Sequence, residues 1–505
     1  MAMIFHSSMR PKPTVARLAG ALALASLSIS ISASGCYVMR PSAGGSEISS
    51  AGPRTVQPAD IALPEGYAVE VVATGLTFPT GVTFDDAGRV YVVEAGYSYG
   101  EVFSTPRLLR IEPNGGTTVV ATGKSPPWTG VAYTNGAFII SEGGLKEGIG
   151  RILRVTPDGQ MTPLVDGLPN GDHHTNGPVI GPDGWVYFGQ GTMTNSGVVG
   201  EDNYKHGWLQ RTPDLHDIPC KDVKLSGVNY TTENPLTSDK GDKVATGAYV
   251  PFGKATEAGQ VIPGKVPCNG AIMKVPPQGG NVELVAWGFR NPFGLAFAPD
   301  GQLYATDNGY DDRGSRPVWG NADWLWRVTP GTWYGWPDHA DGRPIAQERY
   351  RPVGHESVPV MLLAGHPNPP PQPVAYFAVH SSSNGIDFSR NPAFGFVGNA
   401  FVAQFGDQSP DVGKVVHPVG YKVVRVDVKT GVIHDFAANF GRDNGPASKL
   451  KSGGLERPVS VRFDRAGKSL YVVDFGIMLM GMEEYKPKHG TGVLWRITRA
   501  GGGTG

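Results

Sequence analysis

Two adjacent histidines, His173 and His174, lie in a polar, glycine-containing run and are the chain's best candidates for proton transfer. Histidine suits that role because its unperturbed pKa lies near neutrality. Arg290 and Asn291 come just before a run of alternating apolar residues. An arginine at such a position can hold a carboxylate through two parallel hydrogen bonds. The plain alternatives are two solvated loop histidines and an arginine paired with a structural carboxylate.

A third polar group, Asp307 to Gly309, follows a second alternating run. The two runs, 294–297 and 302–305, are joined by Pro299-Asp300-Gly301, which is a strong hairpin signal. The polar groups on either side of this hairpin therefore belong to loops at strand ends. Rigid β scaffolds commonly carry their functional residues on such loops.

The same two-strand unit recurs six times, and this repeat determines the predicted architecture. Each copy has a loop with proline or glycine, a strand, a short turn and a second strand. The copies span residues 76–94, 128–140, 177–189, 287–305, 384–404 and 457–474. Most are followed by a third strand with a basic residue between apolar ones, and several by a fourth. The chain is therefore predicted to be all-β, a six-bladed β-propeller of four-stranded blades.

The sixth unit supplies only three strands before it ends near Arg499. An alternating segment at the other end of the chain, Tyr67 to Val72, can supply the missing outer strand. Closure of the last blade by this N-terminal strand would protect exposed strand edges. The predicted propeller spans residues 62–499, with a lid-like insertion at about 192–268 and a disordered tail at 500–505.

The N-terminal segment has the pattern of an export signal. Basic residues precede an apolar run from Leu18 to about Ile31, which is short for a transmembrane span. The run ends at Ala33-Ser34-Gly35-Cys36, which resembles the lipobox of bacterial lipoproteins. That resemblance implies cleavage before Cys36 and acylation of its thiol. We therefore expect a signal peptide over 1–35, a flexible tether over 36–61 and a periplasmic or cell-surface lipoprotein held to the membrane by its lipid. A freely secreted protein with an incidental cysteine is the alternative.

The two remaining cysteines are Cys220 and Cys268. An even pair in an exported chain favours a disulfide. Neither belongs to a CxxC pair, and the sequence contains no CxxCH haem site. A formal net charge of -1 and the absence of a basic run argue against nucleic-acid binding.

Three motifs resemble the glucose/sorbosone dehydrogenase family: DHHTNG at 172–177, GFRNPFG at 288–294 and WYGWP at 333–337. The resemblance covers roughly residues 62 to 499. Members of this family are six-bladed propellers, and the soluble members studied use pyrroloquinoline quinone with calcium. The resemblance implies an oxidoreductase that oxidises a sugar, or a related alcohol or aldehyde, by hydride transfer to the quinone. Because the chain has no haem site, reoxidation would need an external electron acceptor.

The resemblance also implies roles for individual residues. His173 aligns best with the family's catalytic base, and His174 is a near alternative. Arg290 would take part in catalysis by contacting cofactor carbonyls or carboxylates. The other implied roles are cofactor binding by Asn291, Asn308 and Arg457, and calcium binding by the backbone carbonyls of Gly309 and Tyr310.

The chain departs from the family pattern at three cofactor positions. Val459 replaces the second arginine of a cofactor-binding pair, Phe293 replaces a glutamine, and Gly406 replaces a lysine. The loss of two cations should weaken the binding of an anionic cofactor.

Two other functions suit the same fold. Glu94, Asp307 and Asp474 end equivalent strands, where they could be structural caps or the ligands of a calcium-dependent lactonase. The remaining alternative is a non-catalytic binding propeller that kept the fold and lost the cofactor.

Overall fold

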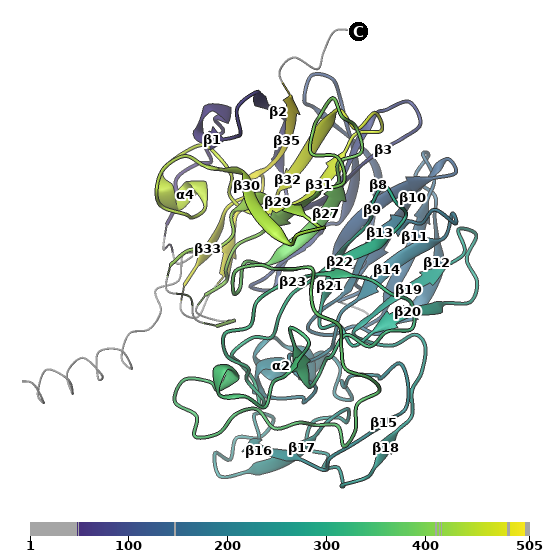
Figure 1. The fold of residues 1–505 in the computed structure, drawn as a ribbon, viewed down its shortest axis with the longest axis vertical. Coiled ribbons are helices and arrows are strands. Elements are labelled where there is room, and N and C mark those ends of the chain that lie inside the picture. Colours follow the sequence, from purple (N-terminus) through teal and green to yellow (C-terminus); the bar gives the residue numbers. More distant parts are fainter. Residues whose placement is uncertain are drawn as a thin grey trace, which may run out of the picture. The chain divides into compact units, whose positions relative to one another are not determined.

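The computed structural model describes residues 48, 50–145, 148–409, 412, 413, 415, 417–481 and 485–499. Six antiparallel sheets follow one another around a common centre (Figure 1). The predicted all-β, six-bladed propeller is therefore confirmed. Among the described residues, no helix has both the length and the apolar character needed to cross a membrane.

Each blade contains four strands in the order inner to outer. The first three blades contain β3 (Pro79–Phe84), β4 (Val90–Glu94), β7 (Arg107–Ile111), β8 (Thr117–Thr122); β9 (Trp128–Thr134), β10 (Ala137–Glu142), β11 (Gly150–Val155), β12 (Met161–Leu168); and β13 (Thr175–Ile180), β14 (Val186–Gln190), β19 (Ala271–Val275), β20 (Glu283–Trp287). The last three contain β21 (Pro292–Phe297), β22 (Leu303–Asp307), β23 (Trp324–Arg327), β26 (Ala375–Tyr376); β27 (Ser383–Phe388), β28 (Ala400–Gln404), β29 (Lys422–Asp427), β30 (Val432–Asn439); and β31 (Pro458–Phe463), β32 (Ser469–Asp474), β35 (Gly492–Arg499), β2 (Tyr67–Leu76).

The inner strands of the blades approach one another closely around the central channel. A Cβ atom at Gly130 in β9 would lie 1.8 Å from the carbonyl oxygen of Gly177 in β13. Only glycine leaves room for this backbone contact. The equivalent position is glycine in five of the six inner strands: Gly81, Gly130, Gly177, Gly294 and Gly385, with Ser460 in the sixth.

Neighbouring blades pack through apolar side chains on facing sheets. Tyr91 and Val93 of the first blade, for example, share a buried cluster with Phe138 and Ile140 of the second. The ring centroids of Tyr91 and Phe138 lie 4.5 Å apart. Because both faces of a blade are covered in this way, the inner strands are buried along nearly their whole length.

The N-terminal segment closes the ring as predicted. β2 pairs antiparallel with β35, from Tyr67 opposite Arg499 to Leu76 opposite Gly492. A shorter strand, β1 (Ile61–Ala62), pairs with the outer strand β30 of the fifth blade. One continuous segment therefore holds the last two blades.

The last part of the expected tether also belongs to the propeller. Arg54 has a side chain that is only 4% exposed, and its guanidinium pairs with Asp474 of β32 at 2.6 Å. It also donates to the carbonyl of Thr491 at 2.7 Å. A buried arginine needs such acceptors. Arg54 therefore attaches this part of the segment to the sixth blade. The predicted signal peptide and Cys36 lie outside the described residues.

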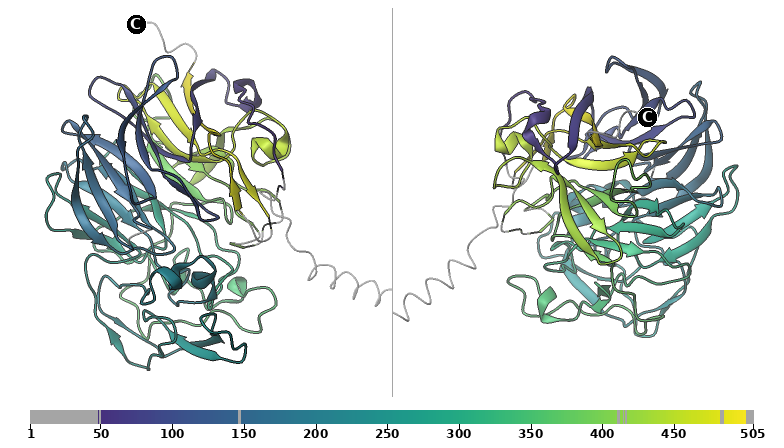
Figure 2. Two further views of the ribbon diagram at one scale, coloured as in Figure 1. Left: turned by 180° about the vertical axis from the view of Figure 1, so that it is seen from behind. Right: turned by 45° about the horizontal axis from the view of Figure 1, so that its top comes forward.

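The expected insertion has structure of its own. It contains α2 (Glu201–Lys205), α3 (Trp208–Arg211) and two β ladders, of β15 (Val223–Lys224) with β18 (Val261–Ile262) and of β16 (Asn229–Glu233) with β17 (Lys243–Gly247). These elements gather on one side of the molecule, at the bottom of Figure 1 and of the left view of Figure 2.

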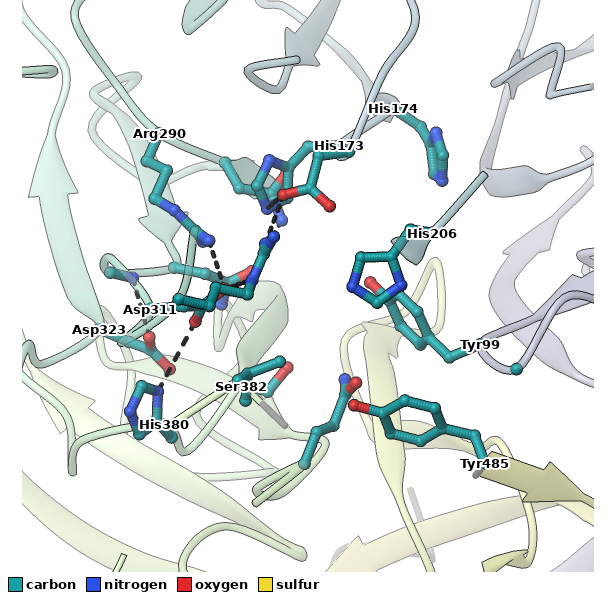
Figure 3. A pocket seen from close by; sticks show the side chains of 18 of the residues that line it. Tyr99, His173, His174, His206, Arg290, Asp311, Asp323, His380, Ser382 and Tyr485 are labelled. Atoms are coloured by element: carbon teal, nitrogen blue, oxygen red, sulfur yellow. Dashed lines mark hydrogen bonds and ion pairs between the residues drawn. The ribbon is translucent and has the colours of Figure 1, made fainter. Parts of the chain in front are cut away.

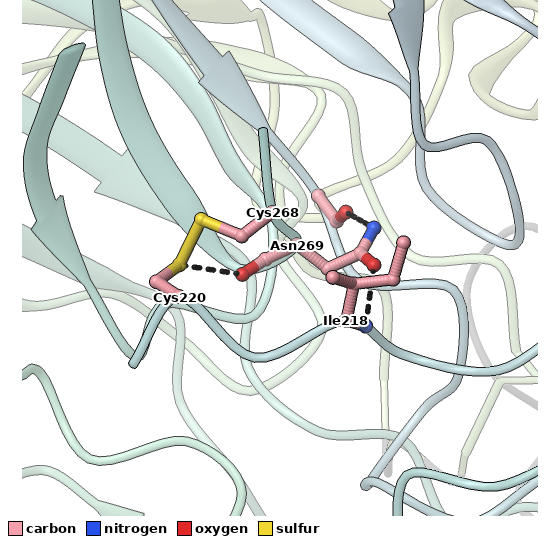
Figure 4. The surroundings of a disulfide bond; sticks show 5 residues. Ile218, Cys220, Cys268 and Asn269 are labelled. Carbon is pink, nitrogen blue, oxygen red and sulfur yellow. Dashed lines mark hydrogen bonds between the residues drawn. A yellow bond between two sulfur atoms is a disulfide. The ribbon is translucent and has the colours of Figure 1, made fainter. Parts of the chain in front are cut away.

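The predicted disulfide between Cys220 and Cys268 is present, and both cysteines are buried. Cys268 lies just before β19, where the insertion returns to the third blade (Figure 4). The neighbouring Asn269 accepts from the backbone N–H of Ile218 at 2.9 Å and donates to the carbonyl of Gly191 at 3.1 Å. The base of the insertion is thus fixed by a covalent bond and by one buried amide.

Candidate active site

A polar cavity opens where the loops between blades meet (Figure 3). It encloses about 870 Å³ of space, part of which is open to solvent. Five predicted site residues line it: His173, Arg290, Asn291, Asn308 and Gly309. We use "mouth" for this cavity; its charged residues include Asp172, His173, Arg290, Asp311 and Arg313.

His173 lies in the loop between β12 and β13 and is 8% exposed. Its Nδ1 lies 3.0 Å from the backbone carbonyl oxygen of Thr192. Because a carbonyl only accepts, Nδ1 carries the hydrogen in this contact, and the tautomer follows from that assignment. Nε2 therefore keeps its lone pair, 3.9 Å from Oδ2 of Asp172. His173 is placed as a proton acceptor.

His174 has a different environment. Its Nδ1 lies 3.2 Å from Oδ1 of Asn170, and its ring lies near those of Tyr97 and Trp208. It also lines the cavity, so it stays the alternative base.

Arg290 lies just before β21, with a side chain that is only 3% exposed. Its Nη2 donates to Oδ2 of Asp311 at 2.6 Å and to Oδ1 of Asn195 at 3.0 Å. The pairing with a structural carboxylate, considered from the sequence, is thus present. Arg290 nevertheless lines the cavity, so its positive charge acts there.

The charges of the mouth and burial together set its pKa values. Burial, reinforced by the positive charge of Arg290, lowers the pKa of His173 to about 3. Burial likewise lowers the pKa of His174 to about 4. Burial opposes the ionisation of Asp172, but Arg313 outweighs it and holds the pKa of that carboxyl below its usual range. At neutral pH the site therefore contains a neutral imidazole beside an ionised carboxylate.

A second cavity adjoins the mouth and shares Tyr99, His174, Asn291 and Asn308 with it. Much of its remaining surface is apolar. We use "floor" for four of its residues: Phe293, Phe405, Val459 and Phe475. Two of the three departures from the family pattern, Phe293 and Val459, therefore meet on one apolar surface.

The third departure, Gly406, lines the mouth with a φ of +94°. A Cβ atom there would lie 2.3 Å from the ring of Tyr421. No larger side chain fits at this position unless that ring moves, so a lysine is excluded by the local packing as well as by the sequence.

Arg457 does not line either cavity, in contrast to its predicted role as a direct cofactor ligand. Its side chain is fully buried behind Phe405 and Gly406, and Nη1 donates to the carbonyls of both residues at 3.3 Å. Phe405 and Gly406 therefore separate the cavities from the guanidinium of Arg457. Two nitrogens of that guanidinium, Nε and Nη2, are buried and lack a hydrogen-bond partner among the described residues.

The two predicted calcium ligands differ in position. Gly309 lines the mouth, and its N–H donates to Oδ1 of Asp323 at 3.0 Å. Tyr310 is 1% exposed, and its hydroxyl donates to the carbonyl of His339 at 3.0 Å. The tyrosine side chain therefore packs away from the mouth.

The three carboxylates proposed for a lactonase are caps within separate blades. Glu94 accepts from the N–H of Thr77 at 2.7 Å, and Asp307 accepts from the N–H of Asn291 at 2.7 Å. Asp474 accepts from the N–H of Arg457 at 2.9 Å. Each joins the end of a second strand to the backbone that leads into the first strand. Among the described residues, no group of three or more His, Cys, Asp or Glu side chains is placed to hold a metal ion.

Sequence reasoning missed several residues of this site. Asp311 and Arg313 complete the mouth, and a sequence signal for them exists: the charged run DDRGSR that follows Tyr310. Tyr99 and Tyr485 lie across the cavity from Arg290 and Asp311 (Figure 3). His206 and Trp208 reach the cavity from the insertion. These contributions come from distant segments and depend on the order of the blades.

Part of the chain matches a known family model, described as Glucose / Sorbosone dehydrogenase. Residues 255–412 match that family. The predicted resemblance is thereby confirmed for a segment that includes Arg290, Asn291 and the loop from Asn308 to Arg313. His173 and Arg457 lie outside the matched segment.

Solved structures with a similar fold include two that match most of the chain. One is the holo form of the pyranose dehydrogenase PQQ domain from Coprinopsis cinerea, at 16% identity over 89% of this chain and 98% of that one, with a TM-score of 0.51. The other is a calcium structure of a Trichoderma reesei enzyme of Carbohydrate-Active Enzymes family AA12, at 17% identity over 89% and 99%, also with a TM-score of 0.51. At these identities the likeness shows the fold. No curated protein sequence matches the chain significantly.

Proposed function

We propose that this protein is an exported oxidoreductase that oxidises a sugar, or a related alcohol or aldehyde, with pyrroloquinoline quinone and calcium. The observation that carries the proposal is the environment of His173. Its Nδ1–H is engaged by a carbonyl, while Nε2 faces the cavity beside the buried Arg290. Arg290 belongs to the segment that matches the dehydrogenase family, whereas His173 comes from a loop outside it.

His173 acts as the base that takes the proton from the substrate hydroxyl. Thr192 holds the ring in the tautomer that leaves Nε2 free to accept it. Once protonated, the imidazole has a carboxylate nearby, since Oδ2 of Asp172 lies 3.9 Å from Nε2. Arg290 favours negative charge that develops in the cavity during the reaction.

The residues around the cavity fit an anionic cofactor, although with fewer cations than the family pattern provides. Arg290 contributes charge at the mouth, and Arg457 has two buried nitrogens without a hydrogen-bond partner among the described residues. The side chains of Asn291 and Asn308 add amide groups between mouth and floor. The carbonyls of Gly309 and Tyr310 are the proposed calcium ligands. Bound there, the quinone would supply the hydride acceptor and calcium a Lewis acid.

The proposal includes export and a lipid anchor at Cys36. It is supported by the basic and apolar leader and by the Ala-Ser-Gly-Cys sequence. A Cys36→Ser protein should be released from membranes, while the intact chain should fractionate with them. An electron acceptor outside the chain is required because the sequence has no haem site.

The decisive experiment titrates the purified apoprotein with pyrroloquinoline quinone and calcium. It then assays dye reduction with a panel of aldoses, alcohols and aldehydes. We expect a spectral change at micromolar cofactor and dye reduction with at least one substrate class. Binding without turnover would favour the non-catalytic propeller, and absence of binding would refute the dehydrogenase.

A further inference from the structure

Arg313 binds three carboxylates at once. It lies in the loop after β22, with a side chain that is 11% exposed. Its Nε lies 3.0 Å from Oδ2 of Asp311, and its Nη1 lies 2.7 Å from Oδ2 of Asp202. Its Nη2 donates to Oδ2 of Asp172. The three nitrogen atoms of the guanidinium are thus all engaged.

The three carboxylates come from three different parts of the molecule. Asp172 precedes His173 in the loop between the second and third blades. Asp202 belongs to α2 of the insertion. Asp311 lies in the same loop as Arg313 and also pairs with Arg290 at 2.6 Å. One guanidinium therefore joins the base loop, the insertion and the arginine of the mouth.

We propose that Arg313 is a positioning residue that fixes Asp172 beside the ring of His173 and fastens α2 of the insertion to the mouth. The inference rests on the proposed function only in that His173 is the base there. Arginine is suited to this position because its planar fork can donate to several oxygens in fixed directions, whereas lysine is a single point charge.

His173 is surrounded by charges from three loops. Asp172 comes from its own loop, Arg290 from the loop before β21, and Asp311 and Arg313 from the loop after β22. Removal of Arg313 would leave Asp172 and Asp202 almost buried without that cation. The carboxylate of Asp172 would then be free to pair with a protonated His173, so protonation of the ring would become easier.

The proposal separates two effects that variants can test. Arg313→Gln removes the cation from all three carboxylates, whereas Asp202→Asn weakens only the link to the insertion. The first should raise the protonation midpoint of His173 and also loosen the insertion. The second should loosen the insertion alone.

The measurement uses the full-length apoprotein, so it does not depend on turnover. NMR of isotope-labelled histidines follows His173, assigned by the signal that His173→Gln lacks, from about pH 8 to about pH 3. Limited proteolysis of the same samples reports cleavage within residues 192–268. We expect the wild-type ring to stay neutral above about pH 4, because burial and Arg290 lower the pKa of His173 to about 3.

In Arg313→Gln we expect the midpoint to rise by about one pH unit or more and cleavage to accelerate about tenfold. Asp202→Asn should accelerate cleavage and leave the midpoint unchanged. An Arg313→Gln protein with an unchanged midpoint and unchanged cleavage overturns the proposal, as does an equal midpoint shift in Asp202→Asn. If the glutamine variant does not fold, Arg313→Lys replaces it, and a lysine variant that behaves as wild type overturns the proposal. If the protein reduces no dye, the dehydrogenase proposal is refuted. The result on Arg313 is unaffected, because it is measured on the apoprotein without turnover.

Discussion

The mouth and the floor of the central cavity are adjacent, yet they are built from opposite chemistry. In the mouth, Arg290 and Arg313 are paired with carboxylates at distances of 2.6 to 3.0 Å. The floor is made of three phenylalanines and Val459. The dehydrogenase-like groups for proton transfer are thus present at the mouth, while the polar groups that would hold an anionic cofactor are depleted below it. Substitution of His173 should therefore affect catalysis, whereas substitution in the floor should affect cofactor affinity.

The largest effect is expected from His173→Ala. Loss of the base should reduce kcat by about 10²–10⁴-fold, while cofactor affinity stays within about twofold. Steady-state dye reduction and cofactor titration measure the two quantities. His216→Ala, in the insertion and outside both cavities, is the matched control. Turnover retained in His173→Ala would move the base to His174.

Arg290→Gln should reduce kcat/KM by about 10–100-fold, because it removes a buried positive charge from the site of developing negative charge. Cofactor affinity should fall as well, since this is the only cation of the matched family segment expected to contact the cofactor. Arg327→Gln on β23 of the same blade is exposed and serves as the control. Equal kinetics for the two variants would contradict a role for Arg290.

Phe293→Gln would place an amide on the floor where the family pattern has one. We expect affinity for pyrroloquinoline quinone to rise about fivefold, which corresponds to about 1 kcal/mol from one hydrogen bond. Phe293→Leu keeps the floor apolar and controls for the change in volume. Affinity is measured by titration of the apoprotein, and a weaker cofactor complex in Phe293→Gln than in Phe293→Leu would refute the expectation.

The smallest expected change concerns pH. Because burial and Arg290 lower the pKa of His173 to about 3, the ring keeps its free base form well below pH 6.5. The acid limb of kcat/KM should therefore lie more than one pH unit below that of an ordinary histidine. A profile measured from about pH 8 to about pH 4.5 tests this, and a midpoint near 6.5 would show that His173 is solvated or is not the base.

The blades could be predicted from the sequence because each is specified by local signals. An alternating strand, a turn such as Pro299-Asp300-Gly301 and a second strand suffice to define the inner half of a blade. The glycine at Gly130 recurs at the same position in four other blades, and in three of them, at Gly81, Gly294 and Gly385, a Cβ atom would lie within 3.2 Å of the next inner strand. The repeated sequence unit therefore specifies much of the packing between blades. The closing strand could be predicted because the sixth unit ends near Arg499 with three strands, while the alternating segment from Tyr67 to Val72 stays without a blade at the other end of the chain.

The details of the site could be predicted less well because they depend on contacts between distant segments. Arg313 reaches Asp172 and Asp202 across more than a hundred residues of sequence. Arg457 follows a loop that resembles a cofactor-binding one, but Phe405 and Gly406 lie between it and the cavity. The tether was predicted from its composition, whereas the burial of Arg54 depends on Asp474 at the far end of the chain.

The pairing of β2 with β35 has a consequence for the order in which the protein is made. β2 is synthesised among the first strands of the propeller, but its partner ends at Arg499, more than 400 residues later. At about 5–20 residues per second, the ribosome needs at least about 20 s to supply that partner. During that time the sixth blade cannot form, and β2 has an unpaired edge. A helper that shields this strand, or passage through a membrane before folding, would protect the nascent chain from aggregation.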